Sequence, residues 1–349
     1  MEADGQAPSL RLVRGRPSLV MALIALSLAM VGYGLWLQDR QAAAPPQPAG
    51  AFHDVQLHRD EIAFARDPAT YYSRVIAEQR LRHYPLKPFI AMRPPALAFF
   101  IAWLPGGATP ARILLGALAA AAAGLWTVRL MSPLGAPGAA AGGLAVATGV
   151  IAAITPSSYL MHECWAGLLI ALSLALHPGE QRKGRAALLT ASLLAGLAAG
   201  VIRELALPFL GVMALMALVE RRPKEALLWA GAIGVCLLTL LAHALAVAPH
   251  ILPTDQGVAW VRMGGWSFLL SADRWNAVAA LKPSLAAVLL PPALAGVLAW
   301  GGPAGRRLWF TVLGYAAGFL VIGRPVTAAP DPAAAAASIM RDISPQHYA

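Results

Sequence analysis

A run of apolar residues without a single charge, 226–248, constrains this chain more than any other feature of its sequence. A helix needs about 20 such residues to cross the hydrocarbon core of a bilayer. Comparable, mostly apolar runs recur near 18–37, 109–130, 136–155, 160–177, 186–202, 204–219, 284–301 and 306–323. The sequence therefore predicts an all-α, polytopic membrane protein with about nine transmembrane helices.

Composition supports this class and excludes others. Hydrophobic residues make up 58% of the chain and charged residues only 13%, too few to cover the surface of a soluble domain of this length. Alternating strands of the outer-membrane barrel type are absent from the sequence. Cys164 and Cys236 both lie in apolar runs, which argues against a disulfide framework and against a cysteine metal site.

The formal net charge of +10 reflects topology rather than nucleic-acid binding. Lys and Arg gather in short loops beside the apolar runs, where they indicate a cytoplasmic side and contacts with membrane lipids. Such loops occur at 180–185, at 220–225 and at Arg306-Arg307, and the N-terminus, 1–17, is also basic. Placing them in the cytoplasm puts the loops 38–93 and 249–283 outside, although the first of these also contains eight Lys or Arg.

The remaining segments divide into a transmembrane domain, 18–325, and an Ala/Pro-rich tail, 326–349, expected to be disordered. The first run is longer than a signal-peptide core and predicts an uncleaved anchor, although "QAAAPP" at 41–46 is similar to a cleavage site. Residues 59–83 predict one or two amphipathic surface helices, broken at Asp67-Pro68. The apolar stretch 94–105 is short for a crossing and predicts a helix dipping into the outer leaflet.

Three separate segments bring ionisable residues to the predicted outer face. His162-Glu163 begins one apolar run, Arg203-Glu204 joins two others, and Asp54 follows the first. Ionisable groups at membrane depth are costly and tend to mark functional sites. Each also has a structural alternative: a solvated helix start favoured by the helix dipole, a structural ion pair, or a surface residue.

The chemistry of this face is not defined by a local motif. The sequence has no glycine-rich dinucleotide loop before a helix, no Walker A loop, and no HExxH or GxSxG in a credible context. Arginine forks can bind phosphate oxygens. A carboxylate can deprotonate a hydroxyl group or bind a divalent cation, so metal dependence is left open.

The chain resembles the polytopic GT-C-fold glycosyltransferases, which include protein mannosyltransferases and aminoarabinose transferases, and is most similar to uncharacterised bacterial members. The resemblance covers most of 18–325 and rests on "HDVQLHRDEI", "DPATYYSRVIAEQRLRHYPLKPFIAMRPP", "HECWAGLLIALSLAL", "IRELALPFLGVMAL" and "GGWSFLL". It implies transfer of a sugar from a polyprenyl-phosphate carrier to an acceptor on the periplasmic face of the bacterial inner membrane.

The resemblance also implies roles for particular residues. The acidic catalytic residue of the first outer loop falls on Asp54, for which Asp60 and Glu61 are competitors. His162 and Glu163 would complete the catalytic site. Arg203 and Glu204 fall where the family keeps polar residues around the cavity. Independently of the family, basic residues predict contacts with the carrier's phosphate or with the lipid headgroup layer: Arg80, Arg82, Lys87, Arg93 and Arg203.

One departure and two rival functions accompany this interpretation. After "VIGRP" the chain continues into an Ala/Pro tail, where relatives continue into a polar-aromatic stretch and another span. A catalytically inactive, truncated relative or a membrane scaffold is therefore one alternative. A transporter or lipid flippase is the other, although such proteins bind substrate near the bilayer midplane between repeats that this sequence does not show.

Overall fold

The computed structural model describes residues 53–150, 157–179, 184–257, 300 and 302–321. Helices dominate these ranges, and no β-strand occurs within them. Several expected segments lie wholly or largely outside the described residues: the anchor 18–37, the cleavage site, all of the span 284–301 but residue 300, most of the loop 249–283, and the tail 326–349.

Three helices among the described residues are long and apolar enough to cross a membrane. These stretches are Ala108–Met131, Arg185–Ile202 and Pro223–His250. They belong to α5 (Ala108–Val150), α7 (Arg185–Ile202) and α9 (Pro223–Val247). They indicate a membrane protein. Two further apolar helices, α6 (His162–Leu176) and α8 (Leu207–Val219), are shorter, so the total of about nine spans stays a prediction.

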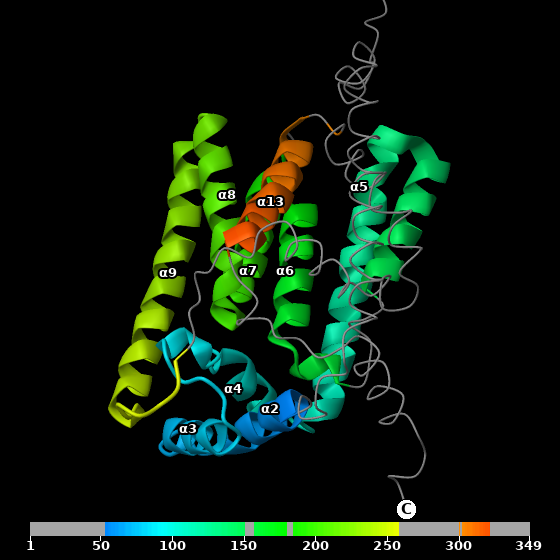
Figure 1. Cartoon of the computed structure of the whole chain (residues 1–349). Helices are drawn as coiled ribbons and strands as arrows, with labels where there is room; N and C mark the ends of the chain where they lie inside the picture. Colours follow the sequence, from blue (N-terminus) through cyan, green and yellow to red (C-terminus); the bar gives the residue numbers. More distant parts are fainter. Residues whose placement is uncertain (1–52, 151–156, 180–183, 258–299, 301, 322–349) are drawn as a thin grey trace, which may run out of the picture.

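Helix α5 is two helices joined at a sharp turn (Figure 1). Gly135 sits at the turn with a φ of 68°, a conformation that glycine adopts without steric cost. A Cβ atom on Gly143 would clash with Oγ1 of Thr127, so the backbone of one arm packs directly against a side chain of the other. The break falls between the expected runs 109–130 and 136–155.

Helices α6, α7, α8 and α9 follow one another up and down, and α13 (Gly302–Val321) lies against α8 (Figure 1). Phe209 of α8 and Trp229 of α9 are fully buried and meet edge to face, with ring centroids 6.2 Å apart. Helix α13 begins at Gly302, four residues before the expected run 306–323, which places Arg306 and Arg307 inside the helix rather than in a loop.

A layer of short helices lies across one end of this bundle (Figure 1). It contains α2 (His53–Phe64), α3 (Tyr71–Leu81) and α4 (Ala96–Trp103). The chain breaks between α2 and α3, as Asp67-Pro68 predicts. Helix α4 has eight residues and is about 12 Å long, too short to cross a bilayer. Short 3-10 turns complete the fold: η2 (Phe89–Ala91), η4 (Ser158–Leu160), η5 (Glu204–Ala206) and η6 (Ala248–His250).

The two ends of the bundle differ in charge. The short-helix end, where α2 to α4 lie, mixes basic and acidic side chains. The opposite end is where α6 and α8 finish and where α7 and α9 begin, and we call it the basic end because Arg185, Arg222, Lys224, Arg306 and Arg307 gather there. By the positive-inside rule, the basic end is expected in the cytoplasm.

Cysteine labelling checks this orientation. In a chain with Cys164 and Cys236 replaced by alanine, Ala69→Cys places a thiol in the exposed turn between α2 and α3, and Lys224→Cys places one at the basic end. A membrane-impermeant maleimide should label Ala69→Cys in cells whose outer envelope has been made permeable to the reagent while the membrane that holds the protein stays intact. It should label Lys224→Cys only after the membrane is permeabilised, and the reverse pattern would invert the proposed topology.

Candidate functional site

Ionisable side chains from four segments converge at the short-helix end. They come from α2, from the segment before α4, from the start of α6 and from the turn between α7 and α8. We call this set the polar cluster: His58, Glu61, Arg93, His162, Glu163, Arg203 and Glu204.

Helix α2 contributes a buried histidine–carboxylate pair. His58 and Glu61 lie one turn apart, and Nδ1 of His58 is 2.7 Å from Oε2 of Glu61. Both side chains are buried. The ring of His58 lies 5.4 Å from the ring of His162 at the start of α6. The pair therefore links the short-helix layer to the transmembrane bundle.

A chain of ion pairs forms the other half of the polar cluster. Oε1 of Glu163 is 2.6 Å from Nη1 of Arg93 and 3.2 Å from Nε of Arg203. Nη1 of Arg203 donates to Oε1 of Glu204 at 2.6 Å. The side chain of Glu163 is 49% exposed, whereas those of Arg203 and Glu204 are 9% and 3% exposed. Glu163 is therefore the acidic member of this chain that solvent reaches.

Local backbone geometry explains how these residues meet. His162 and Glu163 are the first two residues of α6, where the positive end of the helix dipole favours a carboxylate. Arg203 has an extended backbone (φ −144°), which ends α7 and turns the chain into η5 and α8. Alternation of helix direction then brings the start of α6 and the α7–α8 turn to the same end.

Three buried polar atoms of the polar cluster have no hydrogen-bond partner among the described residues: Nδ1 of His162, Nε of Arg203 and Oε2 of Glu204. Of these, Nε of Arg203 still lies within ion-pair distance of Glu163. Leaving such an atom unsatisfied costs about 1–3 kcal/mol, so native structures usually provide a protein group, a water molecule or a ligand. The polar cluster therefore has spare hydrogen-bonding capacity that a polar substrate could use.

The charges of the polar cluster do not favour anions alone. With its histidines neutral, it holds two arginines and three carboxylates. Burial, assisted by the charge of Arg93, lowers the pKa of the Arg203 guanidinium, although a guanidinium group keeps its proton in proteins. An anionic ligand would have to compete with Glu163 for both arginines. The arrangement thus combines positively charged side chains with carboxylates that can accept a proton.

Asp54 is the second residue of α2, and its side chain lies outside what the structure describes. Helical register nevertheless assigns position 54 to the face that holds His58 and Glu61, four and seven residues later. Asp60 is engaged elsewhere, because its carboxylate accepts from Nη2 of Arg82 at 2.6 Å and from Nε2 of Gln56 at 2.9 Å. Among the competitors, Glu61 is therefore the one that joins the polar cluster.

The other basic residues expected to bind the carrier contact different partners. Arg80 forms a two-pronged pair with Asp255, with distances of 2.7 and 2.8 Å, and Nζ of Lys87 donates to the carbonyl of Pro253. Hydrogen bonds from Arg80 lower the pKa of Asp255 to about 2. Arg80 and Lys87 thus connect the segment from α3 to α4 with Pro253 and Asp255, while Arg82 also pairs with Glu78.

The structure therefore brings together His162, Glu163, Arg93, Arg203 and Glu204, and does not join Arg80, Arg82 or Lys87 to them. Sequence reasoning did not assign His58 a role. The signal that could have found it is its spacing of three residues from Glu61 in an amphipathic helix. In the part of the chain that the structure describes, no group of three His, Cys, Asp or Glu is arranged to hold a metal ion.

Comparisons with known proteins add no family assignment. No protein-family model, no curated protein and no solved structure matches this chain.

Proposed function

We propose that the chain is a membrane glycosyltransferase of the bacterial inner membrane. It would move a sugar from a polyprenyl-phosphate carrier to a lipid, glycan or protein acceptor at the short-helix end, on the periplasmic side. The observation that supports this proposal is the polar cluster, in which carboxylates, histidines and two arginines from four segments meet at the end of apolar helices.

The proposed reaction uses these groups in complementary ways. A carboxylate, assigned to Asp54, accepts the proton of the acceptor hydroxyl group while the oxygen of that hydroxyl group bonds to the anomeric carbon of the sugar. The bond between that carbon and the phosphate oxygen breaks, and its electron pair stays on the phosphate. Arg93 and Arg203 would stabilise this negative charge. In the structure Glu163 bridges both arginines. The phosphate would displace the Glu163 carboxylate from them.

The position of the polar cluster favours an enzyme over the rival functions. A transporter of the inverted-repeat type binds its substrate between broken helices near the bilayer midplane. Here the ionisable residues lie where α6 begins and where α7 ends. A site at the membrane boundary suits a lipid-linked donor and a water-soluble or membrane-borne acceptor that approach from one side.

Donor recognition by Arg93 tests the proposal. The full-length protein in lipid nanodiscs would be given polyprenyl-phosphate-linked sugars, and release of polyprenyl phosphate would be measured. Arg93→Gln removes a charge-assisted hydrogen bond, which is worth about 1.5–3 kcal/mol, so we expect the KM for the donor to rise at least tenfold.

Arg59→Gln provides the matched control, because Arg59 is an exposed arginine of α2 outside the polar cluster. Its KM should stay within twofold of the parent value. Equal increases in donor KM for the two substitutions would mean that Arg93 acts only through its general positive charge and does not bind the donor directly. A correctly folded parent protein that turns over none of the donors would contradict the proposed activity.

A further inference from the structure

The basic end holds a second network of charged residues, far from the polar cluster. Its centre is formed by two acidic residues, Glu220 and Glu225, which lie at the end of α8 and in the first turn of α9. Four arginines contact these two carboxylates: Arg185, Arg222, Arg306 and Arg307. The closest contacts are 2.7 Å, from Arg307 to Glu220 and from Arg185 to Glu225.

Among the described residues, the positive charges of this network outnumber its carboxylates. Four guanidinium groups face two carboxylates, which leaves a surplus of two positive charges with His177 neutral. Lys224 adds another cation, and its ammonium group pairs with no carboxylate among the described residues. Partly buried charges are weakly screened by salt, so a specific counter-anion would stabilise this arrangement.

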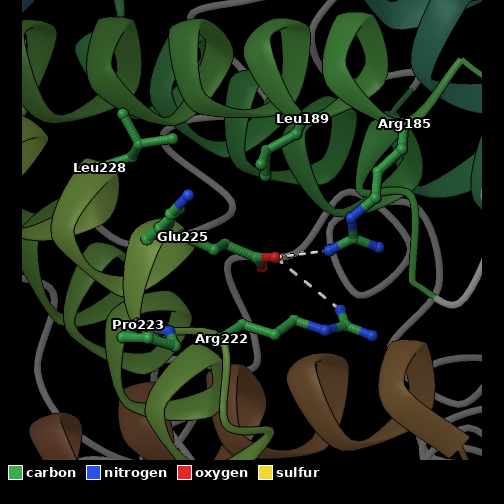
Figure 2. A pocket seen from close by; sticks show the side chains of 7 residues that line it. Arg185, Leu189, Arg222, Pro223, Glu225 and Leu228 are labelled. Atoms are coloured by element: carbon green, nitrogen blue, oxygen red, sulfur yellow. Dashed lines mark hydrogen bonds and ion pairs between the residues drawn. The ribbon is translucent and has the colours of Figure 1, made fainter.

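A hollow of about 400 Å³ opens beside the surplus charge (Figure 2). Arg185 and Arg222 reach from two sides toward Glu225, while Leu189 and Leu228 form an apolar wall. The lining is completed by Pro223 and Lys224. The hollow thus combines cationic groups with an apolar surface, of which Leu228 is 48% exposed.

Two helices begin at this hollow. Helix α7 starts at Arg185, and α9 starts at Pro223. The first turn of a helix presents backbone N–H groups without intrahelical partners, and its dipole favours negative charge. Both helices are long enough to cross a membrane, so their first residues are expected at the depth of the lipid headgroups.

We propose that this hollow binds the phosphate group of an anionic phospholipid. The phosphate would lie between Arg185, Arg222 and Lys224, and an acyl chain would run along Leu189 and Leu228. A free phosphate ion could use the same cations but would leave the apolar wall uncovered. The headgroup depth and the adjoining leucines therefore favour a lipid as the source of the phosphate. This site is independent of the reaction proposed for the opposite end.

Native mass spectrometry of the full-length protein in detergent tests the proposal by titration with short-chain phosphatidylglycerol. Lys224→Gln is the principal variant because Lys224 makes no ion pair with any of the residues that the structure describes. It should weaken binding of the first lipid about fivefold, the effect expected for one basic residue near a membrane surface. Lys224→Gln combined with Arg222→Gln should weaken binding at least twentyfold.

Arg221→Gln is the matched control, because Arg221 is exposed at the same end and does not line the hollow. It should change lipid affinity by less than twofold. The proposal is overturned if Arg221→Gln weakens binding as much as Lys224→Gln, or if neither Lys224 variant differs from the parent. Displacement of the lipid by an equal concentration of inorganic phosphate would also overturn it, because the hollow would then be a site for the free ion.

Discussion

Replacing Arg307 with methionine is expected to destabilise the folded protein by about 3 kcal/mol. Arg307 is only 1% exposed and donates hydrogen bonds to both carboxylate oxygens of Glu220, at 2.7 and 2.9 Å. It also donates to Glu225 at 3.3 Å. Removing one partner of a buried pair leaves the other charge uncompensated, which typically costs about 3–5 kcal/mol. The lower value applies here because Arg185 and Arg222 stay beside the same carboxylates.

The neighbouring residue supplies a matched control. Arg306 has the same charge and lies in the same helix, but its side chain is 51% exposed and approaches Glu220 only to 3.5 Å. An exposed pair is worth about 0–1 kcal/mol, so Arg306→Met should be nearly neutral. Equilibrium unfolding of both variants in mixed detergent micelles measures the difference. Equal free energies of unfolding would mean that the Arg307 pair does not hold α13 to α8 and α9.

The sequence predicts that His162-Glu163 and Arg203-Glu204 lie at the same end of the bundle, because this follows from the alternating direction of consecutive helices. Once α6 and α7 are recognised as consecutive helices joined by a short basic loop, the start of one and the end of the other must face the same side. No long-range contact has to be known. The same reasoning separates the polar cluster from the basic end, where α6 finishes and α7 begins.

The roles of the other charged residues depend on contacts that local sequence does not encode. Arg80 pairs with Asp255, 175 residues further along the chain, so this pair depends on how α3 packs beside the segment after α9. The segment 220–225 predicts a short basic loop, and its sequence does not show that its carboxylates are largely buried because α13 packs over them. Periodicity and charge counts describe one helix at a time and do not reveal which helix covers which.

The choice among Asp54, Asp60 and Glu61 shows the same limit within a single helix. All three acids fall within two turns, and which of them faces the bundle depends on how α2 docks against it. In the structure Glu61 contacts His58, whereas Asp60 pairs with Arg82. Register groups position 54 with His58 and Glu61. Docking therefore separates Asp60 from the polar cluster, and the choice between Asp54 and Glu61 stays a prediction.

Replacing Asp54 with asparagine is expected to lower the rate of sugar transfer by about 10²–10⁴. The proposed mechanism requires a carboxylate to accept the proton of the acceptor hydroxyl group, and an asparagine amide cannot accept it. Donor affinity should stay close to the parent value, because the phosphate is assigned to Arg93 and Arg203. The measurement is the kcat for polyprenyl-phosphate release, with donor KM determined on the same nanodisc preparations.

Asp60→Asn is the matched control, since it alters a carboxylate of the same helix that pairs with Arg82 outside the polar cluster. Its rate should stay within about threefold of the parent, because the Asp60 carboxylate is held by Arg82 and does not reach the polar cluster. Glu61→Gln decides between the two remaining acids. If Glu61→Gln loses transfer while Asp54→Asn keeps it, the base is the buried partner of His58. If an active parent protein tolerates all three substitutions, no carboxylate of α2 accepts the proton and the proposed mechanism fails.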